Sequence, residues 1–380
     1  MSDRRPVAFY APLKGPDHPL PSGDRTMARL LMRALGQAGL TPRLASALRT
    51  LDKAGNGRVQ EDLKRQSRAE ASRLIAHYRA LPEERRPCLW FTYHVYYKAP
   101  DWIGPQVSDA LNIPYVIAEG SRAAKRAQGP WALGHAGAEE ALDRADAIFV
   151  MTAKDRVALE SARPAHQTLV DLPPFMDTGE WPKTSAVRGS PGPQLLAVAM
   201  MRDGDKLASY RILADALARM AHLPWRLAIV GDGEARPEIE RLFAPLSPRI
   251  RFHGQIEDRN RLAALYRNAD LFVWPAVNEA YGMVFLEAQF FGCAVAAGDF
   301  GGVASVVKNG ETGVLTAPGD PAAFSEAMKD LLEHPERLRT LGANAQRFVS
   351  EERNLDGAAL RLQTALSCLS KSGGARPCAS

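Results

Sequence analysis

Two glutamates, Glu279 and Glu287, lie eight residues apart where a predicted strand gives way to a predicted helix. The apolar run Leu271–Trp274 predicts a buried strand. The segment 283–291 predicts a helix closed by Gly292, and another short strand follows it. Glu279 should therefore lie in a loop at the carboxyl end of a strand, with Glu287 about one turn into the helix. This order of elements predicts a parallel α/β unit with its site at the strand ends.

The start of that helix is suited to binding an anion. Its amides have no acceptor within the helix, and the positive end of the helix dipole favours a phosphate there. The amides concerned belong to Tyr281, Gly282, Met283 and Val284. Two glutamates at this spacing are often ordinary surface residues, but Glu287 lies in an apolar helix and needs a partner or a ligand. The pattern favours a nucleotide-sugar site, with pyrophosphate at the helix and a carboxylate for each sugar ring.

Further short motifs, many of them containing glycine, extend this pattern on both sides. They are Ala288, Gly292, Gly301 and Gly302 downstream and Gly231-Asp232-Gly233, Phe252-His253-Gly254 and Leu265-Tyr266 upstream. The downstream set continues E-x7-E with A-x-x-x-G, a short strand and a Gly-Gly pair that predicts the start of a helix. As a set, these motifs resemble the C-terminal domain of the GT-B retaining glycosyltransferases, in particular the large family 4. The resemblance covers 229–320, and the N-terminal half matches only loosely.

The resemblance implies an α/β fold of the GT-B type, with two Rossmann-like doubly wound domains facing across a cleft and a C-terminal helix crossing back. Strands alternate with helices along the chain, and 380 residues suffice for two cores. The expected parts are an N-terminal acceptor-side domain at 1–175, a linker at 176–193, a nucleotide-sugar-binding domain at 194–350, a helix packing back at 351–370 and a disordered tail at 371–380.

Arg202 and Lys206 follow the predicted strand 194–199, at the end of a strand where a ligand is expected. They are either solvated charges of a surface turn or two cations that stabilise a departing pyrophosphate. The family carries an arginine and a lysine in this loop, which favours the second interpretation. Because two such cations could do the work of a metal ion, neither a metal nor another cofactor is predicted.

Three glycines are further candidates for donor binding. Gly254 could let main chain approach a nucleobase, or could simply form a strand-to-helix turn. Gly231 belongs to a Gly-x-Gly motif that is weak by itself. Gly23, ahead of a predicted helix, could let the backbone approach the donor phosphate, or could be a plain lead-in to the helix.

His94 and Glu119 are candidates for the acceptor or sugar side. His94 ends the predicted strand 88–93, although a lone histidine is more often structural. The family often has a histidine near the donor sugar after the next strand, where this chain has Glu119 instead. This departure weakens the case for a histidine-dependent acid/base step. In retaining transfer the leaving phosphate could itself take the acceptor's proton.

The net charge of +5 does not indicate nucleic acid, because the basic residues are dispersed and not interleaved with aromatic residues. These basic residues either form ordinary solvated helix faces or attract an anionic membrane or acceptor. The basic helix 59–81 is the candidate for membrane contact. The four cysteines show no metal or redox spacing, and no apolar run could span a bilayer. We expect a cytoplasmic protein that could associate peripherally with the membrane.

These observations predict a metal-independent, retaining glycosyltransferase of the hexosyltransferase type. It would move a sugar from a nucleotide-diphosphate sugar to a hydroxyl of a glycan, a lipid-linked acceptor or a small molecule. Glu287 is assigned to the ribose and Glu279 to the transferred sugar, while Arg202, Lys206 and the helix amides stabilise the leaving diphosphate. Two alternatives stay open, a non-catalytic nucleotide-sugar-binding protein and a GT-B sugar phosphorylase.

Overall fold

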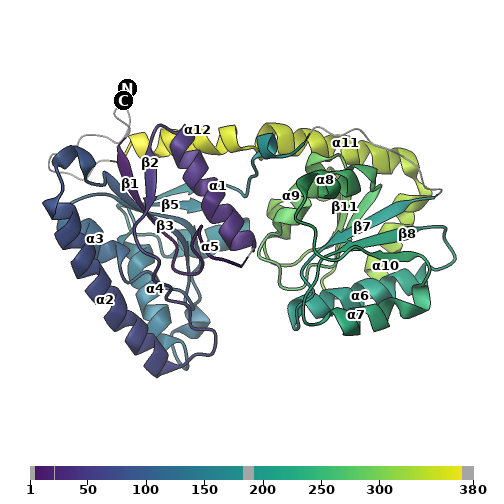
Figure 1. Cartoon of the computed structure of the whole chain (residues 1–380), viewed down its shortest axis with the longest axis horizontal. Coiled ribbons are helices and arrows are strands. Elements are labelled where there is room, and N and C mark those ends of the chain that lie inside the picture. The colour runs from purple at the N-terminus through teal and green to yellow at the C-terminus, as the bar shows by residue number, and fades with distance from the viewer. Residues whose placement is uncertain (1–4, 21, 183–191, 370–380) are drawn as a thin grey trace. The chain divides into compact units, whose positions relative to one another are not determined.

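The computed structural model describes residues 5–20, 22–182 and 192–369, which form two compact units (Figure 1). Unit 1 extends to Pro173 and resumes at Leu355, and unit 2 comprises 174–354. The predicted tail and 183–191 of the predicted linker lie outside the described residues. Linker residues ahead of that gap contact the rest of unit 2, since Met176 is buried and forms a parallel bridge with Asn354, and the Trp181 ring centroid lies 5.4 Å from that of Phe291.

Unit 1 contains one parallel sheet with the order β2-β1-β3-β4-β5-β6. Its strands are β1 (Pro6–Tyr10), β2 (Thr41–Leu44), β3 (Leu89–Val95), β4 (Tyr115–Gly120), β5 (Ala147–Val150) and β6 (Thr168–Asp171). Its α-helices are α1 (Gly23–Gln37), α2 (Gly57–Ala80), α3 (Gly104–Leu111), α4 (Ala132–Arg144), α5 (Ala153–Ser161) and α12 (Leu355–Ser367). The central strands are largely buried, and β5 is entirely apolar, because helices cover both faces of a parallel sheet.

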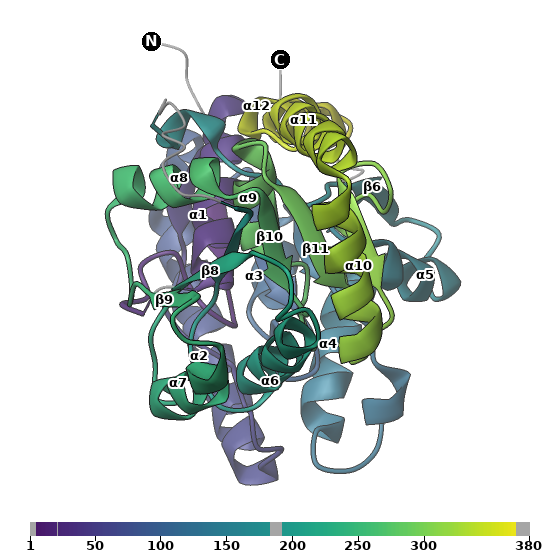
Figure 2. The same cartoon turned by 90° about the vertical axis from the view of Figure 1, so that its right-hand side faces the viewer.

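Unit 2 repeats this architecture with the strand order β12-β11-β10-β7-β8-β9. Its strands are β7 (Gln194–Val198), β8 (Arg226–Val230), β9 (Ile250–Phe252), β10 (Leu271–Trp274), β11 (Ala294–Gly298) and β12 (Gly313–Thr316). Its α-helices are α6 (Asp205–Arg219), α7 (Arg236–Phe243), α8 (Arg259–Asn268), α9 (Met283–Phe290), α10 (Pro321–Glu333) and α11 (Pro335–Glu352). Helix α10 packs against β11 and α6 (Figure 2). The prediction of two Rossmann-like doubly wound domains is confirmed.

The last helix belongs to the first unit. After α11 the chain returns to unit 1, where α12 packs against α1 (Figure 1). The apolar face that α12 buries repeats at helical spacing and comprises Leu355, Ala358, Ala359, Leu362 and Leu366.

One predicted helix is wrong. Gly301-Gly302 leads only to a single 3-10 turn, Val303–Ser305. Gly301 has φ +56°, and a Cβ there would lie 2.0 Å from the Glu279 carbonyl oxygen. The glycine therefore serves a tight turn against the Glu279 loop, and the chain does not have the conformation that a helix start requires.

Candidate functional site

Two of the predicted catalytic residues meet at the carboxyl end of the sheet in unit 2. Lys206, in the first turn of α6, donates a hydrogen bond through Nζ to Oε2 of Glu279, in the loop between β10 and α9. Both side chains are mostly buried, with 24% and 18% exposed. The Lys206 Nζ also lies 5.6 Å from the ring centroid of Trp274, the last residue of β10. We call Lys206, Glu279, Glu287 and the first turn of α9 the Lys206 site.

The loop that carries Glu279 is held against α6. The Asn278 side-chain amide donates to Asp205 over 2.9 Å, and the Val277 amide donates to the Ser209 hydroxyl over 3.0 Å. Ala276 and Asn278 both have positive φ, 59° and 50°, a backbone conformation that non-glycine residues rarely adopt. Strain of this kind persists only where the surroundings enforce it, and it concentrates at functional sites.

Helix α9 begins at a glycine that no other residue could replace without a clash. Gly282 has φ +78°, and a Cβ there would come within 2.8 Å of the Phe285 ring. Gly282 has no side chain to cap the helix, and its carbonyl oxygen accepts a hydrogen bond from the Phe285 amide over 3.1 Å. The dipole of α9 favours an anion at the helix start next to Glu279, and anion binding by the amides of Tyr281, Gly282, Met283 and Val284 stays a prediction.

Glu287 is held from the side by a tyrosine. The Tyr266 hydroxyl of α8 donates to its Oε2 over 2.7 Å, and no hydrogen bond to Oε1 is found among the described residues. Burial raises the pKa of Glu287, and the hydrogen bond from Tyr266 opposes this shift only in part. Oε1 is therefore available to a hydroxyl group, and Tyr266 is a site residue that the sequence motif contained without revealing its role.

Arg202 lies apart from this pair. Its side chain is exposed and makes no hydrogen bond or ion pair with any residue that the structure describes. Only its carbonyl is used, since it accepts from the Leu207 amide over 3.0 Å. The structure thus brings Lys206 and Glu279 together. Arg202 lies in the loop between β7 and α6, and its side chain has no partner among the described residues.

The glycines of the loops after β8 and β9, among them the predicted donor-binding residues Gly231 and Gly254, have packing roles. A Cβ on Gly231 would lie 1.8 Å from the Ala199 carbonyl oxygen, and one on Gly233 would lie 2.3 Å from that of Met201. Gly231 also donates from its amide to the Gly254 carbonyl over 2.9 Å, and Gly254 has φ +68°. The loops after β7, β8 and β9 therefore touch through their backbones, which requires glycine whether or not a ligand binds.

In unit 1, His94 at the end of β3 lies between two carboxylates. Its Nδ1 is 3.1 Å from Asp24 Oδ1 in α1 and 3.6 Å from Glu119 Oε1 in β4. Burial disfavours the imidazolium, but the charges of Glu119 and Asp24 outweigh it and raise the pKa of His94 to about 9. His94 and Glu119 have positive φ, 64° and 62°. We call Asp24, His94 and Glu119 the His94 site; the sequence analysis missed Asp24, whose only signal was its place beside Gly23.

Gly23 itself has no steric reason to be glycine. A Cβ there would meet no atom within 4 Å, and its φ is not positive. The preceding Ser22 caps α1 by accepting a hydrogen bond from the Arg25 amide over 3.3 Å. Gly23 thus lies in an ordinary helix lead-in, and any closer role depends on a ligand.

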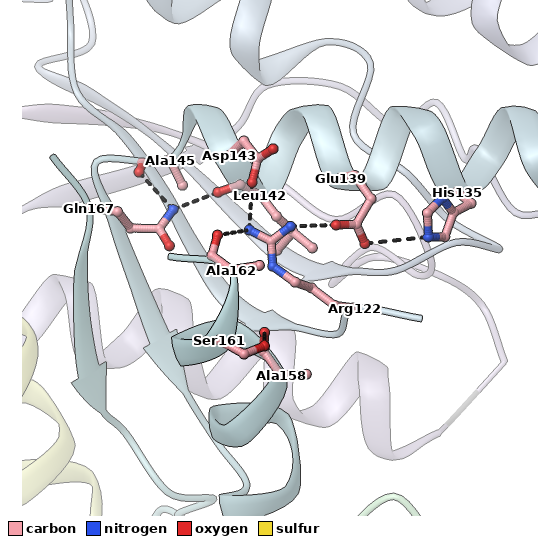
Figure 3. A network of polar contacts seen from close by, with 10 residues as sticks. All are labelled: Arg122, His135, Glu139, Leu142, Asp143, Ala145, Ala158, Ser161, Ala162 and Gln167. Atoms are coloured by element: carbon pink, nitrogen blue, oxygen red, sulfur yellow. Dashed lines mark hydrogen bonds and ion pairs between the residues drawn. The ribbon is translucent and has the colours of Figure 1, made fainter. Parts of the chain in front are cut away.

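Arg122, just beyond Glu119, has a structural role. Only 7% of its side chain is exposed, and it pairs with Glu139 and, over 2.6 Å, with Asp143 of α4 (Figure 3). It also donates to the Ala162 carbonyl over 3.3 Å. These contacts fix the chain that follows β4, so Arg122 is not free to bind a ligand.

Neither unit shows a metal centre within residues 5–20, 22–182 and 192–369, where no group of three or more His, Cys, Asp or Glu side chains could hold an ion. No helix in the same described ranges is long and apolar enough to cross a bilayer. Metal independence remains a prediction.

Part of the second unit resembles a known protein family. Residues 192–334 match the family model for glycosyl transferases group 1. A D-inositol 3-phosphate glycosyltransferase of Rhodococcus erythropolis is 34% identical over 159 residues, 39% of this chain and 35% of that protein. The D-inositol 3-phosphate glycosyltransferase 2 of Catenulispora acidiphila is 32% identical over 227 residues, 55% of this chain and 53% of that protein. The chain thus spans between about a third and about a half of these relatives.

Solved structures resemble the whole chain. Sucrose-phosphate synthase from Thermosynechococcus elongatus has a TM-score of 0.71 at 22% identity, covering 95% of this chain and 98% of that one. Anabaena HepE in complex with UDP has a TM-score of 0.70 at 16% identity, covering 96% of this chain and 100% of that one. The segment 192–334 is therefore similar to the glycosyl transferases group 1 family, and the chain that carries it has the GT-B fold.

Proposed function

We propose that this protein is a retaining glycosyltransferase that moves a sugar from a nucleotide-diphosphate sugar to an acceptor hydroxyl, without a metal ion or other cofactor. The observation that carries the proposal is the contact between Lys206 and Glu279 beside the uncapped start of α9. Relatives named as glycosyltransferases and the UDP and UDP-glucose complexes of HepE support a nucleotide-sugar donor.

In this proposal the donor's diphosphate binds at the first turn of α9, where the positive end of the helix dipole favours it. Lys206 already lies beside that turn, held by Glu279, so its ammonium is placed before the substrate arrives. Negative charge that builds on the leaving diphosphate is then stabilised by a cation and dipoles that need little rearrangement. Arg202 is a second cation for the same group, and its exposed side chain would have to become ordered on binding.

The two glutamates have different tasks. Glu287 accepts from the ribose hydroxyls with the oxygen that Tyr266 leaves free. Glu279 accepts from hydroxyls of the transferred sugar and fixes its orientation. The diphosphate, with its two anionic groups, competes with Glu279 for Lys206, which loosens the ion pair and frees Glu279 for the sugar.

Unit 1 is assigned to the acceptor, a glycan or a lipid-linked molecule. The His94 site would bind hydroxyl groups there, because its carboxylates are acceptors, and Gly23 lies beside Asp24. We also propose a cytoplasmic location, with the basic face of α2 as the surface that would contact an anionic membrane.

The function is tested by a screen of nucleotide sugars against the purified protein, followed by a transfer or donor-hydrolysis assay. A ligand at a hundred times its dissociation constant should stabilise the protein by about 2.7 kcal/mol. Lys206→Met should lower turnover by about a hundredfold, whereas the exposed Arg219→Met at the far end of α6 should not. Binding without turnover would favour a non-catalytic protein, and turnover that requires inorganic phosphate would favour a phosphorylase.

A further inference from the structure

Two cations share one pair of aromatic rings in unit 1. Lys98 Nζ lies 5.7 Å from the ring centroid of Tyr97 and 5.4 Å from that of Trp131, and Arg126 Cζ lies 5.3 Å and 4.9 Å from the same two centroids. We call Tyr97, Lys98, Arg126 and Trp131 the basic-aromatic cluster. All four side chains are partly exposed, so a ligand can reach them.

Neither cation has a carboxylate partner among the described residues, and the Arg126 Nε is buried without a hydrogen-bond acceptor. This differs from Arg122, four residues earlier, which has two carboxylates. Two like charges held over the same rings repel each other, and cation–π contacts offset that only in part. An anion that binds both would relieve the repulsion and supply the missing acceptor.

The cluster is preorganised by its backbone. Tyr97 and Lys98 form the tip of a turn closed by hydrogen bonds between Tyr96 and Ala99. Trp131 donates from Nε1 to the Asp52 carbonyl over 3.3 Å, which holds its ring in place. Gly134 at the start of α4 packs so closely that a Cβ there would lie 2.3 Å from the Tyr97 carbonyl oxygen.

A row of aromatic rings joins the cluster to the His94 site. His94 lies 4.9 Å from the Tyr96 ring, Tyr96 lies 5.5 Å from Tyr97, and Tyr97 lies 5.8 Å from Trp131, all as centroid distances. His94 lies near the end of β3, next to its final residue Val95, and Trp131 directly precedes α4 in the segment that follows β4, so both ends of the row belong to unit 1. A ligand whose hydroxyl lies near His94 could therefore lay a sugar ring along the aromatic row and reach the cluster with an anionic group.

We propose that the basic-aromatic cluster binds a phosphate or diphosphate group of the acceptor, so that the acceptor of this enzyme is a phosphorylated molecule. Phosphate is the favoured anion because its several oxygens can bind a guanidinium and an ammonium together. The inference rests on the proposed transferase function, since it names the class of acceptor.

The test is a calorimetric titration of inorganic pyrophosphate into the 380-residue protein and three double variants. Lys98→Gln with Arg126→Gln should abolish one binding event or weaken it at least about tenfold. Arg202→Gln with Lys206→Gln should affect a second event only. Lys154→Gln with Arg85→Gln, which removes two exposed cations of the same unit outside α2, should change neither.

The outcomes separate the two proposals. If only the Arg202 and Lys206 variant changes binding, the acceptor phosphate site is rejected and the donor site stands. If only the Lys98 and Arg126 variant does, the cluster stands and the donor site fails. Sedimentation with phosphatidylcholine vesicles, with and without phosphatidylglycerol, completes the test: a Lys98 and Arg126 variant that loses vesicle binding but keeps pyrophosphate binding would make the cluster a membrane contact and overturn the inference.

Discussion

Unit 2 sets a lysine against one glutamate at its strand ends, whereas unit 1 sets a histidine between two carboxylates. The first arrangement is a neutral pair whose cation can turn to an arriving diphosphate. The second keeps His94 protonated at neutral pH, because Glu119 and Asp24 outweigh burial and raise its pKa to about 9. Its two carboxyl groups suit hydroxyl groups, and burial raises the pKa of Glu119. The same fold thus presents a lysine for a phosphate in one unit and a carboxyl-rich site in the other.

The largest expected effect is on the unit 2 side of this comparison. Glu279→Gln keeps the shape of the side chain but removes the charge that holds Lys206, so sugar orientation and the position of the cation are both disturbed. We expect kcat to fall by about 10²–10³ with little loss of stability. Steady-state kinetics with the identified donor measure this. Wild-type turnover in a folded variant would remove Glu279 from the site.

Glycines give the next test of the comparison, because each unit has one at a predicted donor-binding position. Gly231→Ala should destabilise unit 2 by about 2–3 kcal/mol, since its φ is +144° and the new Cβ would meet a carbonyl oxygen. Gly23→Ala, in open space at the start of α1, should change stability by less than about 0.5 kcal/mol. Urea unfolding measures both. Lower activity in a fully stable Gly23 variant would point to a ligand at Gly23.

The charge of His94 predicts a pH dependence. Its pKa is raised in the folded state from 6.5 to about 9, so the resulting stabilisation is complete below pH 6.5 and is lost as pH rises through 9. The upper bound is about 3 kcal/mol. Unfolding free energies of wild type and His94→Gln, measured between pH 6 and 10, should differ most at the acid end of this window.

Several ionisable groups act electrostatically with or near His94, namely Asp24, Glu119, Asp155 and Tyr96. The matched control is therefore a histidine in a different environment, whose pKa shifts the other way. Burial lowers the pKa of His253 in unit 2, the opposite direction. His253→Gln should therefore leave the alkaline limb of the stability curve as it is in the wild type. A loss of stability between pH 6.5 and 9 that persists in His94→Gln would contradict the assignment.

Among the polar residues of the two sites, the smallest effect is expected for Tyr266. Tyr266→Phe removes the hydroxyl that donates to Glu287 and leaves that buried carboxylate with one donor fewer, which should cost about 1–2 kcal/mol and raise the pKa of Glu287 further. Denaturant unfolding and donor affinity measured at pH 6 and 8 would show it. The double variant with Glu287→Gln should lose less than the sum of the two single changes.

Much of the fold could be predicted because alternating apolar strands and amphipathic helices leave few arrangements other than two doubly wound sheets. Gly301-Gly302 shows the limit of that reasoning. A glycine pair can start a helix or permit a tight turn, and here the carbonyl of Glu279, more than twenty residues earlier, occupies the space a side chain would need. Local sequence does not reveal which neighbour will be there.

The sequence by itself determined the class of fold, the place of Glu279 and Glu287 around a helix start, and the presence of cations in the loop after β7. Only the tertiary structure decided which charges meet, as with Lys206 and Glu279, 73 residues apart, and His94 and Asp24, 70 residues apart. It also placed Lys98 and Arg126 over the same two rings, those of Tyr97 and Trp131, although basic and aromatic residues looked dispersed along the chain. The reason is that parallel strands end at one edge of a sheet, where distant loops meet and electrostatic energies depend on spatial separation.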